Sequence, residues 1–495
     1  MCHLCVARAA SEQSSPEAAR TAIHAFTSGT SYIDALADEF SWSGIAGTAA
    51  TIGYSFSQSF FGGSLMTAAQ QSASQSVLQQ WANVANLTFT LAPSSGTLSI
   101  TQKDLGSGLL GLTTTEYIGA LADRSEVHIN TTETGFTAGG SGYLTLLHEV
   151  GHALGLKHPG NYGEFDTGPY LPASEDTYNA SVMSYNEGDM ASESHRPITP
   201  MIYDIAAVQF LYGANTSFAT GNDTYTLTGA NEVKAIWDAG GTDVITASGL
   251  GSNVVIDLRE GLSNVSRVGD SYFWNAFGAN LENGIGGTGN DVLFGNSLAN
   301  TLQGGAGNDN LDGGESADWM EGNQNSDVLS GGAGTDSLFG GQGTDEIYGN
   351  QESDRIEGNF ANDTIFGGQG DDTLYGGQDA DLLYGNLAND ALLGNLGADS
   401  LFGGLGNDSY TGGGDADVFA FGGQSGNDVI TDFDVNGDAI RIVSGLNGIT
   451  SGSGALAHLS ASGSNTLLDL GSGNSVLILN IGVSQLTADD FMIGG

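Results

Sequence analysis

The hydrophobic and polar residues between Gly286 and Ala420 follow a strict period of nine. Fifteen consecutive nine-residue units, called nonads below, can be cut from this segment without a gap. They begin with GGTGNDVLF, GNSLANTLQ and GGAGNDNLD and end with GGGDADVFA. Every nonad starts with Gly and has an apolar eighth place, and the sixth place is Asp in all but one, where Asn300 stands. A flexible Gly/Asp-rich linker has no reason to keep such a period, so the pattern favours a repeat structure over a linker.

We expect the first six residues of each nonad to form a turn and the last three to form a short strand. The eighth-place side chain would point inward. Two nonads then make one coil of a parallel β-roll, which is stable only when coils stack and cover each other's apolar face. The sixth-place carboxylates of stacked turns converge and repel each other unless hard cations such as Ca²⁺ lie between them. The predicted calcium ligands are Asp291, Asp309, Asp318, Asp327, Asp336, Asp345, Asp354, Asp363, Asp372, Asp381, Asp390, Asp399, Asp408 and Asp417.

A second period, of helical type, occupies residues 143–154, where apolar residues recur at the spacing of one helix face. His148 and His152 are four residues apart and share one side of this predicted helix. His158 would lie about 120° away if the helix continued. Gly155 can adopt the left-handed conformation that ends a helix, so the chain can turn and bring His158 back to the same ion.

Three imidazoles around one centre suit Zn²⁺ with an open position for water. Glu149 would face that water, take its proton as the oxygen attacks a carbonyl carbon, and pass the proton to the leaving amine. HExxH alone arises by chance on structural helices, whereas the full HExxHxxGxxH is far more specific. Twenty-five residues after His158, the segment SVMSY would place Met183 as an apolar floor beneath the ligands. Taken alone, Met183 would be an ordinary core residue.

These motifs resemble the serralysins, metzincin zinc endopeptidases that carry RTX nonapeptide repeats. The resemblance is carried by LLHEVGHALGLKHPGNYG, SEDTYNASVMSY, PITPMIYDIAAVQFLYGAN and the nonads, and it covers about residues 30–495. It implies that His148, His152 and His158 bind zinc and that Glu149 is the general base. It also implies that Tyr185 ligates zinc at rest and then hydrogen-bonds the developing oxyanion, although without the family Tyr185 would be taken for a packed aromatic residue.

The resemblance implies an α+β metzincin catalytic domain followed by an all-β parallel β-roll. We predict a prosegment at 1–30, the zinc metalloprotease domain at 31–215 and a β-rich cap or linker at 216–285. The RTX roll follows at 286–420, and a β-rich region with a type I secretion signal at 421–495. Segment 125–130 alternates apolar and polar residues, and we predict that it is an edge strand on the cleft rim with His128 in a structural role. The fourth place of eight nonads lacks Gly, which we expect to weaken the cation geometry there.

Charge and composition narrow the choice of partners. The chain has 57 acidic and 11 basic residues and a formal net charge of −46, which disfavours nucleic acids and acidic membranes and attracts cations. No apolar run is long enough to span a membrane. The only cysteines are Cys2 and Cys5, so no disulfide framework is expected. Either one of these thiols binds the catalytic zinc before a prosegment is removed, or the N-terminus has no role at the zinc.

We therefore predict a secreted, calcium-stabilised zinc endopeptidase that cleaves extended stretches of extracellular proteins. We expect a monomer whose partners are its protein substrates and the type I secretion machinery, because the N-terminus lacks the features of a secretory signal peptide. The repeats would stay unfolded in low cytosolic calcium and fold outside. The alternative is a non-catalytic RTX calcium-binding surface or adhesion protein. A pore-forming RTX toxin would need long apolar segments, and a protease with one dedicated target stays open.

Overall fold

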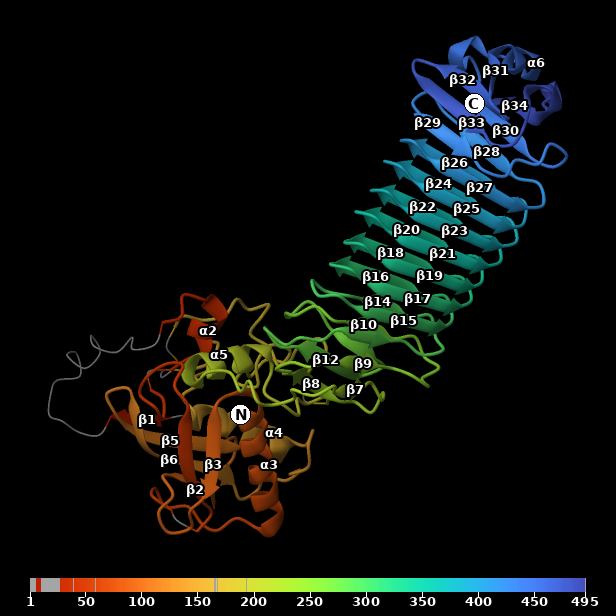
Figure 1. The fold of residues 1–495 in the computed structure, drawn as a ribbon. Coiled ribbons are helices and arrows are strands. Elements are labelled where there is room, and N and C mark those ends of the chain that lie inside the picture. The colour runs from red at the N-terminus through yellow and green to blue at the C-terminus, as the bar shows by residue number, and fades with distance from the viewer. Residues whose placement is uncertain are drawn as a thin grey trace. The chain divides into compact units, whose positions relative to one another are not determined.

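The computed structural model describes residues 6–9, 27–38, 40–57, 59–163, 166, 168–192 and 194–494. The chain divides into two compact units, and each is described by itself. The first contains the described residues up to Asp223 together with Leu227–Asp243 and Glu260–Leu281. The second contains Thr224–Thr226, Val244–Arg259 and the described residues from Glu282 onward. Figure 1 labels their helices and strands.

A mixed sheet and four helices build most of the first unit as described. The sheet has the strand order β1-β5-β6-β4-β2-β3, and β5 is antiparallel to β6 while the other neighbours are parallel. The strands are β1 (Val6–Ala9), β2 (Ala50–Ser55), β3 (Leu87–Leu91), β4 (Leu98–Lys103), β5 (Gly111–Ile118) and β6 (Leu121–Asn130). The helices are α2 (Ser31–Leu36), α3 (Ala68–Val84), α4 (Ser141–Ala153) and α5 (Ile202–Tyr212). Later in this unit come β8 (Val233–Ile236), β11 (Ser266–Val268) and β12 (Ser271–Asn275).

The prediction that residues 125–130 form an edge strand is wrong. They belong to β6, which has β5 on one side and β4 on the other. All six of these residues, polar and apolar alike, are buried, so both faces of the strand are covered. Ordinary strand alternation cannot reveal this, since covering of both faces depends on segments far away in the sequence. The edges of this sheet are the short strands β1 and β3, and β5 lies next to β1, which pairs with it along only four residues.

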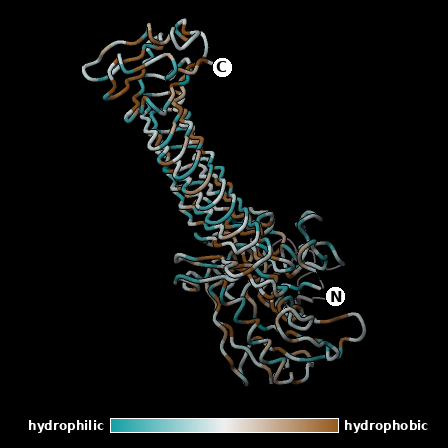
Figure 2. Tube along the Cα trace, turned by 90° about the vertical axis from the view of Figure 1, so that its right-hand side faces the viewer, coloured by the Kyte–Doolittle hydropathy of each residue, from teal (hydrophilic) through white to brown (hydrophobic). Residues whose placement is uncertain are grey.

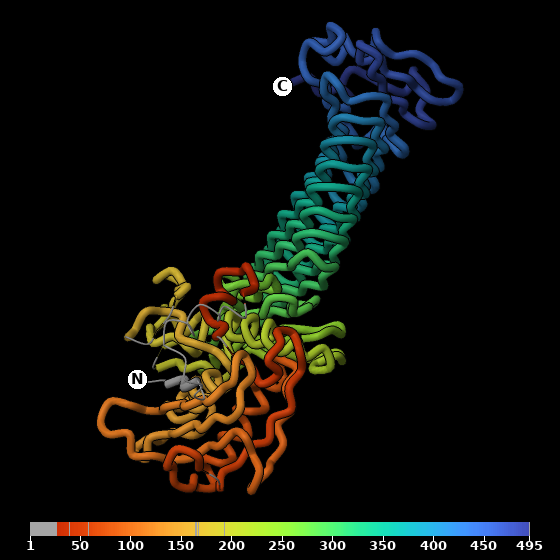
Figure 3. Tube along the Cα trace, turned by 90° about the vertical axis from the view of Figure 1, so that its left-hand side faces the viewer, coloured from red at the N-terminus to blue at the C-terminus, as the bar shows by residue number. Residues whose placement is uncertain are grey.

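The second unit is dominated by a parallel β-roll, as predicted. Its coils stack as successive rungs in Figures 1 and 3. Each strand pairs in parallel with the strand 18 residues later, for example Leu302 with Met320 and Leu338 with Ile356, so two nonads make one coil. The eighth-place side chains from Leu293 to Phe419 are fully buried. Figure 2 shows hydrophobic and hydrophilic residues alternating along each coil.

Two sheets form the roll within this unit. One runs in the order β34-β30-β28-β26-β24-β22-β20-β18-β16-β14-β10, and the other in the order β31-β32-β33-β29-β27-β25-β23-β21-β19-β17-β15-β13-β9-β7. The strands before and within the repeats are β7 (Thr224–Thr226), β9 (Val244–Thr246), β10 (Val255–Asp257), β13 (Asn283–Ile285), β14 (Val292–Phe294), β15 (Thr301–Ala306), β16 (Asn310–Glu315), β17 (Trp319–Gln324), β18 (Val328–Ala333), β19 (Ser337–Gln342), β20 (Glu346–Gln351), β21 (Arg355–Phe360), β22 (Thr364–Gln369), β23 (Thr373–Gln378), β24 (Leu382–Leu387), β25 (Ala391–Leu396), β26 (Ser400–Leu405) and β27 (Ser409–Gly414). The C-terminal strands are β28 (Val418–Phe421), β29 (Asn427–Ile430), β30 (Ala439–Val443), β31 (Leu459–Ser462), β32 (Asn465–Gly471), β33 (Asn474–Ile478) and β34 (Phe491–Gly494), with the short helix α6 (Gly452–Ala455) among them.

The strands of the roll are longer than the predicted three residues. From β15 to β27 each covers six residues, from the seventh place of one nonad to the third place of the next. The first-place glycine is therefore part of a strand and faces inward. A Cβ atom on Gly304 would lie 2.4 Å from Oδ2 of Asp309, so a side chain cannot be accommodated. Close packing against the buried carboxylate, and not a turn, explains why the first place is always Gly.

The fourth place keeps its left-handed backbone even where Gly is missing. Seven of the eight non-glycine residues there have φ between 63° and 80°, namely Ser316, Asn325, Glu352, Ala361, Asp379, Ala388 and Asp415. Such angles strain an L-amino acid by about 1–2 kcal/mol, so stacking of the coils holds the turn in place. The backbone turn is thus kept in these nonads, while the expected weakening of the cation geometry stays a prediction.

Candidate metal centre

The three histidines of the extended motif lie together at the end of helix α4. His148 and His152 are on the helix, which ends at Ala153, and Gly155 has a φ of +92°. A Cβ atom on Gly155 would lie 2.3 Å from the carbonyl oxygen of Phe40. Both this contact and the positive φ therefore disfavour a side chain at position 155. Leu156 then forms an antiparallel bridge with Ala37. This turn directs the following residues, and with them His158, back toward α4.

The imidazole rings converge through the same nitrogen atom. The Nε2 atoms of His148 and His152 are 3.1 Å apart, those of His152 and His158 are 3.1 Å apart, and those of His148 and His158 are 3.3 Å apart. All three residues are buried, with 7% of their surface exposed. The ligand atoms therefore surround one common point.

The other ring nitrogen of each histidine fixes the tautomer. Nδ1 of His148 donates to the carbonyl oxygen of Val182, and Nδ1 of His152 donates to that of Leu156, each over 2.8 Å. Nδ1 of His158 lies 2.7 Å from a carboxylate oxygen of Asp166. Carbonyl and carboxylate oxygens accept here, so Nδ1 carries the proton and Nε2 presents a lone pair.

Three lone pairs that face each other at about 3 Å repel, unless a proton or a metal ion lies between them. Burial opposes the proton: it lowers the pKa of His148 to about 3 and that of His152 well below its usual value, with further lowering by the neighbouring imidazoles. A divalent cation bound between the three Nε2 atoms would remove this repulsion. The donor set of three neutral imidazoles with oriented Nδ1–H groups fits Zn²⁺.

Glu149 lies beside this cage and is almost completely buried. The hydroxyl group of Thr113, on β5, is 2.8 Å from Oε2 of Glu149 and 2.8 Å from its main-chain carbonyl oxygen. A Cβ atom on Gly111 would lie 2.5 Å from Cγ of Glu149, so a glycine is required for β5 to pass this side chain. Strand β5 thus holds the Glu149 carboxylate against helix α4 and leaves this side chain little freedom to rotate.

Met183 and Tyr185 both contact the cage region. Met183 is fully buried, and a Cβ atom on Gly151 would lie 2.6 Å from its sulfur, so Met183 packs directly against the helix turn between the two histidines. Oη of Tyr185 lies 2.7 Å from Nε2 of His158. The ring of Tyr185 packs against that of Tyr162 at a tilt of 32°, with centroids 4.7 Å apart. The phenol oxygen therefore points at the same centre as the imidazoles.

Asp204 positions the segment before Met183, a role that the sequence did not reveal. This residue of α5 is fully buried and accepts hydrogen bonds from Oγ of Ser181 over 2.5 Å and from the backbone N–H of Val182 over 2.7 Å. Burial raises the pKa of Asp204 to about 7, although these donors lower it. Since the Val182 carbonyl oxygen accepts from His148, the Asp204 side chain supports the orientation of His148 through one intervening residue.

A small pocket of about 80 Å³ opens next to the cage. It is lined by His148, Glu149 and Tyr185 from the centre, and by Leu144, Tyr178 and Arg196 from its walls. Sequence reasoning did not identify the wall residues, because they come from three separate segments. A side chain adjacent to a reacting carbonyl group would fit this space.

The predicted calcium ligands form two buried ladders in the roll. Each sixth-place Asp from Asp309 to Asp417 accepts, through Oδ1, the backbone N–H of the sixth-place residue 18 positions earlier, as Asp327 does from Asp309 over 2.8 Å. From Asp309 to Asp417 the Oδ2 atoms are buried without a hydrogen-bond partner among the described residues. Burial and neighbouring carboxylates raise the pKa of Asp327, Asp354 and Asp363 to about 8. Buried carboxylate oxygens without donors are suitable ligands for Ca²⁺.

A further group of carboxylates was missed in the sequence. Oxygen atoms of Asp223, Asp238 and Asp243 lie within 4.8 Å of one another, and Asp238 and Asp243 are fully buried. The run DAGGTD contains two of them and lies within the predicted β-rich cap or linker. Its resemblance to the glycine and aspartate content of the nonads is the signal that could have pointed to it.

His128 and His195 do not belong to these groups of metal-ligating residues. His128 is fully buried, and its Nδ1 lies 2.9 Å from the Thr101 hydroxyl on β4, which agrees with a structural role. His195 lies 3.5 Å from a carboxylate oxygen of Asp270. Cys2 and Cys5 lie outside the described residues.

Comparison with known proteins identifies the repeat and the relatives. The model of the RTX calcium-binding nonapeptide repeat matches residues 285–320, 312–347, 321–356, 348–383 and 384–419. Metalloprotease AprA of Pseudomonas entomophila (strain L48) is 35% identical over 47% of this chain and 54% of its own length. Serralysin of Proteus mirabilis is 40% identical over 33% of this chain and 37% of its own length. Serralysin G of Dickeya chrysanthemi is 35% identical over 53% of this chain and 63% of its own length.

The chain thus spans about half the length of the curated relatives it matches. The predicted resemblance to serralysin-type metalloproteases with RTX repeats is confirmed, and both predicted metals, zinc and calcium, agree with these matches. Among solved structures, extracellular lipase LipA from Serratia marcescens aligns over 42% of this chain and 39% of its own, with a TM-score of 0.22 and 18% identity. No helix in the described part of the chain is both long and apolar enough to cross a membrane.

Proposed function

We propose that this protein is a zinc endopeptidase whose β-roll is stabilised by calcium. The observation that carries the proposal is the cage itself: three Nε2 lone pairs face one point, with the Glu149 carboxylate beside them. A zinc ion held by His148, His152 and His158 supplies Lewis-acid chemistry, because it makes a water molecule acidic near neutral pH and polarises a carbonyl group. The resemblance to metalloproteases supports the same reaction.

The residues of the chain divide the remaining work. Glu149 accepts the proton of the attacking water, while the Thr113 hydroxyl holds Oε2, and it then protonates the leaving amine. The Tyr185 phenol is in reach of the developing oxyanion, to which it donates a hydrogen bond. The Nδ1–H bonds to Val182, Leu156 and Asp166 keep the three rings oriented throughout.

Replacing Tyr185 by Phe should lower kcat by about 10²-fold to 10³-fold with little change in KM, because a donor to the transition-state charge is lost. The zinc content should stay the same, since the three histidines remain. Steady-state kinetics on a fluorogenic peptide, together with metal analysis, would check this. Tyr375→Phe, which removes a phenol from strand β23 of the roll, is the control, and equal kcat in both variants would contradict the role of Tyr185.

The open edge of β5 is the proposed site for an extended substrate. Its first residue lines the pocket beside Glu149, and a peptide that pairs with a sheet edge gains main-chain hydrogen bonds. Strand β1 occupies this edge farther along, with Val6 opposite Thr114 and Ala9 opposite Tyr117. This pairing supports the proposal that residues 1–30 are a prosegment that blocks the substrate edge.

Removing residues 1–9 should raise kcat/KM on peptide substrates by at least about tenfold, because the edge of β5 becomes free. A second variant without residues 1–5 separates two explanations. If strand pairing inhibits, this variant stays slow; if a thiol of Cys2 or Cys5 inhibits by binding zinc, it is already fast. Equal activity of the full chain and both variants would contradict a prosegment.

The proposal that this protein acts outside the cell rests on the calcium chemistry of the roll. Ca²⁺ that binds only the folded repeats couples folding to the calcium concentration, which suits a protein that folds after export. We propose a secreted monomer that leaves the cell through a type I machinery recognising residues 421–495. The catalytic domain is proposed to be residues 31–215, the cap 216–285 and the roll 286–420.

Casein digestion tests the proposed function directly. The protein purified with Ca²⁺ and Zn²⁺ should cleave casein at internal peptide bonds, as mapped by mass spectrometry. The zinc chelator 1,10-phenanthroline should stop cleavage, and added Zn²⁺ should restore it. An absence of new termini with zinc bound would overturn the proposal and favour the adhesion alternative.

A further inference from the structure

One sheet of the roll carries a continuous ladder of aromatic rings on its outer face. Tyr348, Phe366, Tyr384 and Phe402 occupy the ninth place of alternate nonads, on β20, β22, β24 and β26. Their ring centroids are 5.0, 4.9 and 4.8 Å apart in order, with interplanar angles of at most 21°. The same place in the other sheet holds Glu357, Tyr375, Leu393 and Thr411. The repeat therefore does not require the ladder.

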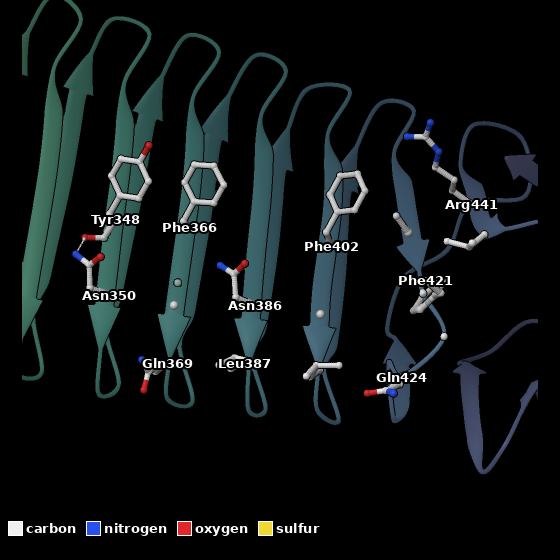
Figure 4. A pocket seen from close by; sticks show the side chains of 18 of the residues that line it. Tyr348, Asn350, Phe366, Gln369, Asn386, Leu387, Phe402, Phe421, Gln424 and Arg441 are labelled. Carbon is white, nitrogen blue, oxygen red and sulfur yellow. Dashed lines mark hydrogen bonds between the residues drawn. The ribbon is translucent and has the colours of Figure 1, made fainter. Parts of the chain in front are cut away.

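A groove of about 1160 Å³ runs beside this ladder (Figure 4). It crosses six neighbouring strands from β20 to β30, which corresponds to a length of roughly 24 Å at the usual strand spacing. Gly368 and Gly404 form its floor, and Leu387 and Leu405 form its other wall. These two leucines expose 44% and 43% of their surface. The groove is thus long, narrow and mostly apolar.

Apart from the side-chain amides of Gln369 and Gln424, which line it, the groove offers few hydrogen-bonding groups to a ligand. The backbone of its strands is paired within the parallel sheet. The side-chain amides of Asn350 and Asn386 donate back to carbonyl oxygens of their own strands, those of Tyr348 and Tyr384. A peptide or an oligosaccharide brings many polar groups that would find no partner here, and leaving such groups unpaired is unfavourable. A hydrocarbon chain has no such requirement.

A positive charge lies at one end of the groove. Arg441, on β30, lines it at the end that adjoins the C-terminal strands (Figure 4). Arg441 and Arg355 are the only basic residues after Arg267. Arg355 pairs with Glu357 on the other sheet, whereas Arg441 forms no ion pair with any residue that the structure describes. An exposed cation beside an apolar groove, in a chain of net charge −46, complements an anionic group.

We propose that this groove binds a single-chain anionic amphiphile, with its acyl chain along the aromatic ladder and its headgroup at Arg441. The acyl chain lies along the ring edges of Phe366 and Phe402 and contacts Leu387 and Leu405. The guanidinium group forms charge-assisted hydrogen bonds with a phosphate or carboxylate. The groove lies wholly in the second unit, so its binding does not depend on peptidase activity.

Isothermal titration with 1-myristoyl lysophosphatidylglycerol, below its micelle-forming concentration and in the presence of Ca²⁺, tests the proposal. The full chain should bind this lipid at least about fivefold more tightly than the zwitterionic 1-myristoyl lysophosphatidylcholine. Glycerophosphoglycerol, which has the headgroup without the chain, should show no heat of binding. Shortening the chain to twelve carbons should weaken binding roughly fivefold to fifteenfold, because two methylene groups leave the apolar surface.

Four variants with exposed substitutions locate the site. Arg441→Gln should remove the preference for the anionic headgroup, and the double variant L387N/L405N should weaken binding of both lipids about tenfold. Arg355→Gln and Leu396→Asn are the matched controls, because they alter the same residue types on the other sheet, and they should bind like the parent. Far-UV circular dichroism verifies that each roll is folded.

Equal affinity for the two lysolipids overturns the role of Arg441. Equal weakening by the groove variants and their controls overturns the site. Binding of glycerophosphoglycerol alone, as strong as that of the lipid, would mean a phosphate site without an acyl groove and also contradicts the proposal.

Discussion

Replacing Glu149 by Gln should reduce kcat for peptide hydrolysis by about 10²-fold to 10⁴-fold, the usual contribution of a general base. The amide cannot accept the proton of the attacking water, and it has no proton to give to the leaving amine. Gln is chosen because its carbonyl oxygen can keep the 2.8 Å contact with the Thr113 hydroxyl, so the geometry of β5 and α4 should survive. Steady-state kinetics on casein or a fluorogenic peptide measures the loss.

Zinc content separates this effect from loss of the metal. The three histidines are untouched, so the Glu149→Gln protein should bind zinc like the parent when measured by elemental analysis. Glu346→Gln, an exposed residue of the roll, serves as a control for the substitution itself and should retain full activity. If Glu149→Gln kept parental activity with zinc bound, Glu149 would not be the base.

The extended zinc motif could be interpreted from the sequence because its geometry is local. A helical pair four residues apart, a glycine that ends the helix and a third histidine need no distant information, and the structure places His148, His152 and His158 as that logic requires. The period of the nonads is local in the same sense: each coil contacts the next at a fixed offset of 18 residues. Stacking therefore follows from the repeat alone.

What the sequence did not reveal depends on contacts between distant segments. The sequence around His148 does not indicate that the Val182 carbonyl oxygen accepts a hydrogen bond from its Nδ1–H. Nor does it indicate that Asp204, from a third segment, accepts a hydrogen bond from the Val182 backbone. The edge strand was assigned to 125–130 because alternation is visible there, whereas position in the sheet follows from which strands pair. The groove along Phe366 and Phe402 was also missed, since it arises only when the ninth places of alternate nonads line up.

Removing calcium at pH 7.5 should unfold the roll, with loss of most of its strand signal in far-UV circular dichroism. The carboxylates from Asp309 to Asp417 are buried, and their Oδ2 atoms have no hydrogen-bond donor among the described residues. Their ionised form is therefore unfavourable in the folded roll unless Ca²⁺ is bound. Each site that is saturated at a hundredfold excess of calcium over its Kd adds about 2.7 kcal/mol to the free energy of unfolding. Mg²⁺ should not replace calcium, because it needs stricter octahedral geometry and gives up its water reluctantly.

The pH dependence of the calcium-free protein should be opposite to ordinary acid denaturation. Burial raises the pKa of Asp345 to about 6 and those of Asp327 and Asp363 to about 8, from a usual value of 3.8. A raised pKa favours the protonated form in the folded state. This contribution to stability is complete below about pH 4 and is lost as the pH rises through 6 to 8. In chelator, lowering the pH from 7.5 to 5 should therefore restore part of the strand signal.

A neutral side chain at the sixth place should reproduce this effect without acid. Asn300 shows that an amide is tolerated there: its Oδ1 accepts from the Asn296 N–H and its Nδ2 donates to the Glu282 carbonyl oxygen. Asp363→Asn should thus retain more strand signal than the parent in chelator at pH 7.5, and gain less from added calcium. Asp489→Asn, an exposed residue outside the repeats, should change the strand signal neither with calcium nor without it. If Asp363→Asn retained less strand signal than the parent in chelator, the buried carboxylate would stabilise the empty roll, and charge repulsion would not be the reason that the roll needs calcium.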